Sequence, residues 1–176
     1  MGSAEWMPTG RTDLQDVAPF RGHAPDQHRP LGGYAMLMGT YLTLSGAFAL
    51  WWRSTGRELP ERVSAGDLAL VTVATHKAAR LAARDRVTAT LRAPFTSFQQ
   101  DAGPGEVDEA ARGSGLRRAI GELLVCPYCM DMWFATAFLA GLIAAPAAAR
   151  WVASSFAVLT GADVLQVAYK KAESLL

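Results

Sequence analysis

A run of uncharged residues from Leu31 to Trp52, LGGYAMLMGTYLTLSGAFALWW, constrains the fold of this chain more than any other feature. In a helix, about 20 such residues span the roughly 30 Å hydrocarbon core of a bilayer. Tyr34 lies near one edge of the run and Trp51 and Trp52 close the other, as expected for side chains that anchor a helix at the membrane interface. We therefore predict that Leu31–Trp52 is a transmembrane helix.

The composition of the chain also favours lipid over nucleic acid as its environment. Hydrophobic residues make up 51% of the 176 residues, and the mean hydropathy is +0.12, both high for a soluble protein of this size. The formal net charge is only +1, from 17 basic and 16 acidic side chains, and no basic cluster surrounds an aromatic platform. We expect the lipid bilayer as a partner and no nucleic acid.

Two further spans are predicted near the C-terminus. Met132–Ala149 is uncharged, and Trp151–Tyr169 is apolar apart from two polar side chains. Because only Arg150 separates the two segments, they should form a tight helical hairpin. Pro146, near the end of the first segment, indicates a kink or the start of a turn.

The segment Asp67–Arg84 can be interpreted in two ways. Its first half is apolar, but its second half carries several basic side chains, so it either spans the membrane or lies on its surface as an amphipathic helix. If it spans, both tails and the loop from Arg84 to Val125 lie on one side of the membrane.

The basic residues distinguish these two arrangements. With a spanning Asp67–Arg84, one side carries Arg11, Arg21, Arg29, Arg84, Arg86, Arg92, Arg112, Arg117, Arg118, Lys170 and Lys171, and the other carries Arg53, Arg57, Arg62 and Arg150. This asymmetry follows the positive-inside rule and is lost if the segment does not span. We therefore predict an all-α integral membrane protein with four transmembrane helices and both termini in the cytoplasm.

The remaining segments complete the predicted organisation. Residues 1–30 read as a polar, disordered cytoplasmic tail, and residues 31–176 as a four-helix membrane domain with spans at about 31–52, 67–84, 130–149 and 151–169. Within its cytoplasmic loop, the Gly-rich and acidic residues 97–115 read as a flexible insertion. Leu116, Ile120, Leu123 and Leu124 then recur at helical spacing, which predicts a short interfacial helix.

Three ordered blocks resemble the signature of the domain of unknown function 1360 (DUF1360) family. Their motif residues are Arg84, Asp85 and Thr88, then Arg92, Pro94 and Phe95, then Gly121, Glu122, Cys126, Pro127, Cys129 and Trp133. The resemblance covers roughly Asp67 to Tyr169. It implies a small multi-pass protein of the bacterial inner membrane, in a family with one branch labelled sporulation-associated and with no established activity.

The pair Cys126 and Cys129, in the tetrapeptide CPYC, allows two interpretations that involve no metal. Cys126 falls near the N-cap and Pro127 in the first turn of a helix, where the missing proline N–H costs nothing, so the pair can be simply a helix start. A soluble glutaredoxin is excluded because the chain offers no βαβ pattern near the motif. A membrane thiol-redox site remains, because a helix N-terminus lowers the pKa of a thiol, although there is no second Cys pair.

A metal site is the third interpretation of Cys126 and Cys129. Two thiolates are half of a tetrahedral zinc site. The other ligands would have to come from His76, His23 or His28, or from a second chain in a homodimer that joins two Cys pairs. A cofactor, if there is one, is therefore zinc shared between chains.

Polar side chains are also predicted inside the bilayer. His76, Lys77 and Arg80 in the second span and Asp163 and Gln166 in the fourth lie at similar depths, counted from the cytoplasmic ends. An ionised Asp in hydrocarbon is costly, so Asp163 should have a partner among the three basic residues. We predict an intramembrane polar cluster.

These observations favour an accessory or interaction subunit, in a homodimer or larger membrane complex, without chemistry of its own. The alternative is a membrane thiol-redox or zinc-binding protein, in which Cys126 and Cys129 would be the catalytic or metal-binding residues.

Overall fold

The computed structural model describes residues 13–175, so the part of the predicted tail that precedes residue 13 lies outside the described residues. Six α-helices and one hairpin follow a single 3₁₀ turn, η1 (Leu14–Asp16). The elements are α1 (Leu31–Ser54), α2 (Ala65–Arg84), α3 (Ala89–Arg92), β1 (Thr96–Gly103), β2 (Glu106–Ala111), α4 (Gly115–Leu124), α5 (Pro127–Ala144) and α6 (Pro146–Glu173).

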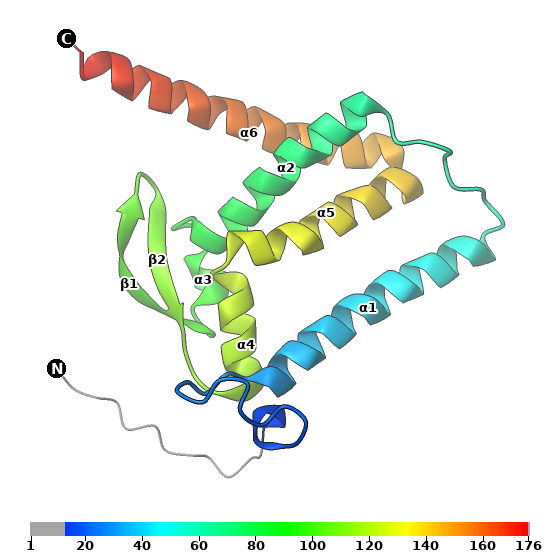
Figure 1. Cartoon of the computed structure of the whole chain (residues 1–176). Helices are drawn as coiled ribbons and strands as arrows, with labels where there is room; N and C mark the ends of the chain where they lie inside the picture. The colour runs from blue at the N-terminus through cyan, green and yellow to red at the C-terminus, as the bar shows by residue number, and fades with distance from the viewer. Residues whose placement is uncertain (1–12, 176) are drawn as a thin grey trace.

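The four long helices alternate in direction (Figure 1). α1 and α5 begin beside α4 and run away from it, and α2 and α6 run back. The short elements α3, α4 and the hairpin gather at the end where α2 stops and α5 begins. We call this end of the molecule, residues 85–126, the polar end. It contains most of the loop that was predicted to be cytoplasmic.

Two of the described helices, α5 and α6, are long and apolar enough to cross a membrane, by length and composition. Only 6% of the residues in the most apolar stretch of each are buried, so neither resembles the core helix of a soluble protein. α6 has 28 residues and is about 42 Å long at 1.5 Å per residue, which exceeds the hydrocarbon core.

The bounds of these two helices differ from the predicted spans of 130–149 and 151–169. α5 already begins at Pro127 and ends at Ala144, and Pro146 is the first residue of α6. Proline suits this position because the first N–H groups of a helix have no intrahelical acceptor. The turn therefore lies at Ala145, and Arg150 belongs to α6 rather than to the connection.

The chain is mostly helical, as predicted, but it is not all-α, and residues 97–115 form most of a β-hairpin in place of the predicted flexible insertion. β1 and β2 pair as an antiparallel hairpin, with Thr96 opposite Ala111 and Gly103 opposite Glu106. The turn uses Gly103 at φ +147° and Gly105 at φ +78°, backbone conformations that favour glycine. The Gly-rich composition that indicated flexibility is thus the composition of a tight turn.

Residues 13–30 also differ from the disordered tail that was predicted. The Gln15 side chain donates to the carbonyls of Ala24 and Gln27 at 3.2 and 3.1 Å and accepts from the Arg29 backbone N–H at 2.5 Å. Asp13 accepts from the Gly32 N–H at 2.9 Å and so caps the start of α1. Side-chain hydrogen bonds order this segment although it has few apolar residues.

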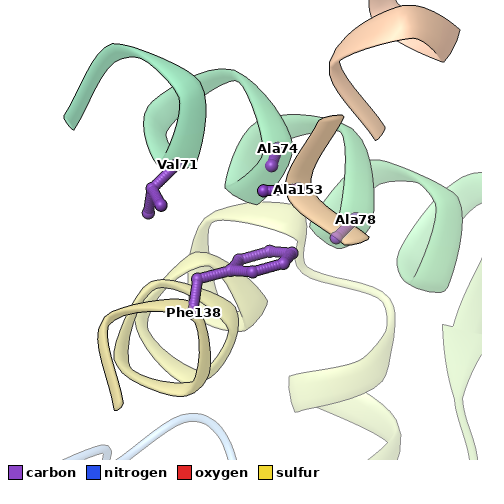
Figure 2. Close-up of a cluster of buried hydrophobic side chains, with 5 residues drawn as sticks. All are labelled: Val71, Ala74, Ala78, Phe138 and Ala153. Carbon is purple, nitrogen blue, oxygen red and sulfur yellow. The ribbon is translucent and has the colours of Figure 1, made fainter. Parts of the chain in front are cut away.

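The buried core lies where α2 packs against both α5 and α6 (Figure 2). It consists of Val71, Ala74 and Ala78 of α2, Phe138 of α5 and Ala153 of α6. The alanines let the helix backbones approach closely, as small residues do in membrane bundles. The core is small because most apolar side chains of the long helices face outward.

Candidate functional site

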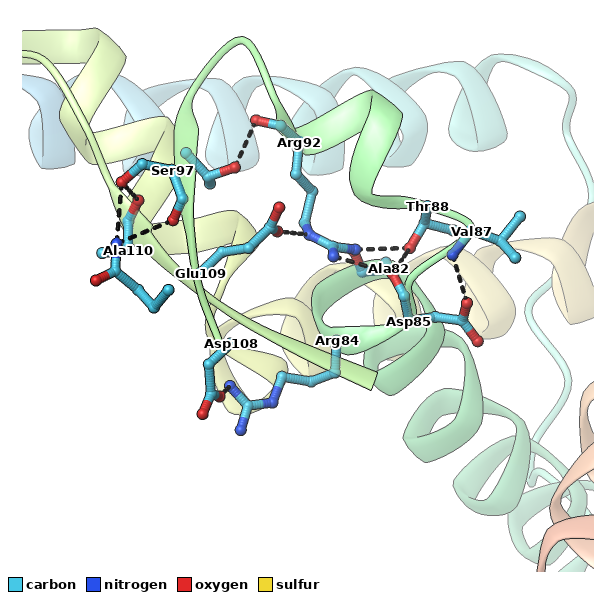
Figure 3. Close-up of polar contacts among 12 residues, drawn as sticks. Ala82, Arg84, Asp85, Val87, Thr88, Arg92, Ser97, Asp108, Glu109 and Ala110 are labelled. Carbon is cyan, nitrogen blue, oxygen red and sulfur yellow. Dashed lines mark hydrogen bonds and ion pairs between the residues drawn. The ribbon is translucent and has the colours of Figure 1, made fainter. Parts of the chain in front are cut away.

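Arg92 is the centre of a buried polar cluster at the polar end (Figure 3). Its side chain is 1% exposed, and its Nε donates to the Glu109 carboxylate, which is 6% exposed. Its terminal nitrogens donate to the Ala82 carbonyl at 2.8 Å, the Asp85 carbonyl at 2.9 Å and Thr88 Oγ1 at 2.6 Å. Ala82 and Asp85 lie at the C-terminal end of α2, where carbonyls lack helical partners. Arg92 therefore joins the end of α2 to β2.

Further contacts fasten the hairpin to α2. Arg84 forms an ion pair with Asp108 at 2.6 Å (Figure 3), and Arg80 forms one with Glu106 at 2.7 Å. The Arg86 backbone N–H donates to the Gly105 carbonyl at 2.8 Å. We call the Arg92 cluster together with these contacts the hairpin clamp.

Other motif residues join the hairpin to α4. The Pro94 carbonyl accepts two hydrogen bonds from Arg117, at 2.9 and 2.7 Å. A Cβ atom added to Gly121 would lie 2.4 Å from the Phe95 carbonyl oxygen and 2.9 Å from Ala111 Cβ, so only glycine fits there. These motif residues therefore have structural tasks that the sequence did not reveal.

The predicted intramembrane cluster divides into two ion pairs. Lys77 Nζ lies 2.5 Å from Asp163 Oδ2, which joins α2 to α6. Arg80 instead binds Glu106 of β2. His76 lines a cavity with both Lys77 and Asp163, and Gln166 lines a neighbouring one. Lys77 is thus the partner of Asp163 among the three basic residues that were considered.

A second ion pair joins α2 to α6 at the opposite end of these helices, and the sequence analysis missed it. Arg150 Nε and Nη2 donate to the two Asp67 carboxylate oxygens at 2.7 and 2.9 Å. The shift of the α5–α6 turn to Ala145 explains why Arg150 was assigned to a connection. The sequence did contain a signal for this pair, because an acidic residue, Asp67, lies in the first turn of α2 and a basic residue, Arg150, lies near the start of α6.

Cys126 and Cys129 occupy the first turn of α5. Cys126 is the N-cap, and its Sγ accepts from the Cys129 backbone N–H at 3.2 Å, while Pro127 is the first helical residue. The two sulfurs are joined as a disulfide, with an S–S distance of 2.30 Å and a Cα–Cα distance of 5.2 Å. Cys129 is exposed and Cys126 half-buried. The pair therefore begins the helix and also forms a covalent link.

The disulfide borders a cavity of about 770 Å³, which we call the Cys pocket. It lies between α1, α4, α5 and the end of β2. Its lining includes Arg29, Tyr34, Leu37, Met38, Arg118, Glu122, Cys126, Cys129, Met132 and Trp133. One end is polar, because Glu122 accepts hydrogen bonds from Tyr34 and, at 3.0 Å, from Arg118. Trp133, the last motif residue, packs edge-on against Tyr41 of α1, with 5.3 Å between the two ring centroids.

Metal binding within one chain has no structural support in the described residues. No three His, Cys, Asp or Glu side chains of residues 13–175 gather to hold a metal ion. A zinc site at Cys126 and Cys129 would therefore need ligands from a second chain.

Comparison with known proteins adds a family but no activity. The family described as "Protein of unknown function (DUF1360)" matches residues 70–169. The chain is 29% identical over 107 residues to a protein named Sporulation protein YjcA from Bacillus subtilis (strain 168), and the alignment covers 59% of this chain and 91% of that protein. No solved structure matches the chain significantly.

Proposed function

Because this chain belongs to the DUF1360 family of proteins of unknown function, we propose its function from its own structure. It crosses the bacterial inner membrane four times and acts as an accessory or interaction subunit without chemistry of its own. The observation that carries this proposal is the outward-facing apolar surface of the long helices. Leu50 of α1 and Leu165 of α6, for example, are both 71% exposed. Monomeric soluble proteins rarely expose large continuous apolar surfaces.

The two helices α1 and α2 complete the four spans. α1 has 24 residues and no charge before Arg53. α2 has 20 residues and packs between α5 and α6, and its charges at Asp67 and Lys77 are paired. Pairing lowers the free energy of placing charged groups in hydrocarbon. The alternating directions of the four helices agree with the start of α1 and the end of α6 on the same side of the membrane (Figure 1).

The polar end supports an interaction role. The hairpin clamp holds α3 and the hairpin against α2, and the most exposed large apolar side chains of this end are Val87, Leu91 and Phe98. They lie outside the four proposed spans, so the hydrocarbon core does not cover them. Phe98 also borders a hollow of about 590 Å³ lined by residues of α3. Exposed apolar groups on a rigid polar surface are typical of a site for a protein partner.

Reporter fusions test the topology. A reporter inserted at Gly105 in the hairpin turn should lie in the cytoplasm, and one at Gly56 after α1 should lie on the opposite side. Neither glycine has another atom within 4 Å of an added Cβ, so both positions lie at open places on the surface. If both reporters label the same side, α2 lies on the membrane surface and the four-span proposal is wrong.

A second candidate function is a membrane thiol-redox or zinc protein. The Cys126–Cys129 disulfide favours the redox function, whereas zinc binding requires the reduced pair, because zinc is held by thiolates. A Cys at a helix N-cap is stabilised as a thiolate by the helix dipole, which favours both metal binding and disulfide exchange. Cys129 is exposed and so can be reached by a partner's thiol or ligand.

Replacing both cysteines with serine separates the two functions. Serine is a better N-cap than most residues, so the variant Cys126→Ser/Cys129→Ser should stay inserted in the membrane with its helices intact. If the protein has no chemistry of its own, its oligomeric state and its zinc content by elemental analysis should also be unchanged. A loss of zinc would favour the shared metal site. A wild-type disulfide that transfers electrons reversibly to added quinone would favour the redox function.

A further inference from the structure

The Cys pocket has the shape and position of a site for an amphiphile. Pockets that bind small molecules usually measure about 300–1,000 Å³, and this cavity is about 770 Å³. Side chains of α1 and α5 form part of its lining, and those two helices face lipid in the proposed function. A ligand in the bilayer can therefore enter it sideways without crossing water.

The part of the Cys pocket around Glu122 carries hydrogen-bond donors that have no acceptor among residues 13–175. Arg118 uses only its Nε, in the bond to Glu122, and its two terminal nitrogens donate to no acceptor among residues 13–175. Arg29 lies 3.9 Å from the same carboxylate. Two guanidinium groups and one carboxylate leave one positive charge. A planar guanidinium with free donors is well suited to a phosphate oxygen pair.

Most of the remaining lining is apolar, and part of it comes from the proposed spans α1 and α5. Leu37 and Met38 of α1 face Met132 and Trp133 of α5 across the cavity. Tyr34, whose hydroxyl donates to Glu122, stands between the polar and apolar parts. Tyrosine and tryptophan prefer this depth, at the level of the lipid headgroups. The cavity thus changes from cationic to apolar in the direction in which a lipid changes from headgroup to chain.

We propose that the Cys pocket binds an anionic phospholipid of the cytoplasmic leaflet, with its phosphate on Arg118 and Arg29 and its acyl chain against Met38, Met132 and Trp133. This inference rests on the membrane location proposed above. A zwitterionic headgroup fits less well, because its ammonium group would lie near the two guanidinium groups. Bound lipid would fill the space between α1 and α5 beside the disulfide.

Fluorescence quenching in vesicles of defined composition tests the site. The purified chain is reconstituted into phosphatidylcholine vesicles that contain increasing fractions of phosphatidylglycerol with brominated chains, which quench nearby tryptophans. The signal of Trp133 is taken as the difference between the wild type and Trp133→Phe, because the chain has five tryptophans. We expect this signal to be quenched at low phosphatidylglycerol fractions, and brominated phosphatidylcholine in the same amounts to quench it far less.

Two neighbouring arginines provide the variant and its control. Arg118→Gln removes the proposed phosphate ligand and should raise the phosphatidylglycerol fraction for half-quenching about tenfold, as expected for the loss of a charge-assisted hydrogen bond. Arg117→Gln removes the same charge one position earlier, where the side chain donates to the Pro94 carbonyl instead. It should leave the fraction nearly unchanged.

The outcomes separate this inference from the membrane proposal. Equal quenching by both lipids, or equal effects of the two arginine variants, would overturn the lipid site and leave the membrane location intact. A soluble headgroup, glycerophosphoglycerol, should not compete; if it does, the site takes a water-soluble phosphate compound and the lipid assignment is wrong. A chain that fails to float with either vesicle would overturn both proposals.

Discussion

At the scale of single residues, the buried contacts of Arg92 give a structural reason for the arginine in the second block of the family motif. A buried guanidinium needs acceptors for its donors and a counter-charge, and Glu109, Thr88 and two carbonyls at the end of α2 supply them. Because these partners come from different elements, one side chain sets the position of the hairpin relative to α2. The motif around Arg92 thus has a structural task, because it holds the hairpin against the end of α2.

Truncation of Arg92 should therefore release the hairpin. Arg92→Ala leaves the Glu109 carboxylate buried without a counter-charge, and breaking such a pair costs about 3–5 kcal/mol. We expect a lower midpoint of thermal unfolding in detergent and rapid proteolytic cleavage within residues 96–111. Arg112→Ala is the matched control, since Arg112 makes one exposed hydrogen bond to the Ala93 carbonyl. Equal protease resistance in both variants would show that Arg92 does not hold the hairpin.

At the scale of elements, ion pairs link α2 to α6 near both ends of their contact. Asp67 binds Arg150 at one end, and Lys77 binds Asp163 nearer the polar end. The two helices also share the buried core, to which α2 contributes Ala74 and Ala78 and α6 contributes Ala153, small side chains that allow close approach but offer little area. Polar contacts of this kind can set the rotation and register of helices whose apolar faces are smooth.

A double-mutant cycle measures the contribution of the Lys77–Asp163 pair. Asp163→Asn should lower thermal stability in detergent because it leaves Lys77 without its counter-charge, and Lys77→Gln in the same chain should restore part of the loss. The coupling energy should be about 0.5–2 kcal/mol, as for polar contacts between membrane helices. Arg80→Gln is the control, because Arg80 binds Glu106. Additive effects of Asp163→Asn and Lys77→Gln would contradict the pairing.

At the scale of the whole molecule, the chain separates into an apolar body and a polar end. The long helices carry their apolar side chains outward, whereas most of the ionic contacts lie in the hairpin clamp and α4. This division matches the proposed orientation, in which the polar end and both termini lie in the cytoplasm and the turns after α1 and α5 lie on the other side.

Removal of α6 should reverse the location of the C-terminus. Each span changes the side of the chain, so a reporter fused after Glu173 should lie with the hairpin, and one fused after Ala145, with α6 deleted, should lie on the opposite side. Protease protection in sealed inverted vesicles distinguishes the two. The same location for both reporters would mean that α6 does not span, whatever its length.

The amino-acid sequence by itself determined the features that depend on a few neighbouring residues. The start of α1 at Leu31, the N-cap at Cys126 and the first turn at Pro127 follow from local hydrophobicity and from the missing proline N–H. The sequence also named Lys77 among three possible partners of Asp163, because both positions were counted along helices from the ends predicted to be cytoplasmic.

Only the tertiary structure decided which groups meet across elements. Residues 97–115 contain the glycines of a tight turn, but the Glu109 contact to Arg92 that holds the hairpin joins segments that no local pattern connects. The choice of Glu106 for Arg80 depends on where the folded hairpin lies against α2. The Cys pocket likewise has walls from α1, α4, α5 and β2. Such sites arise from packing, which sets distances between side chains that the sequence leaves independent.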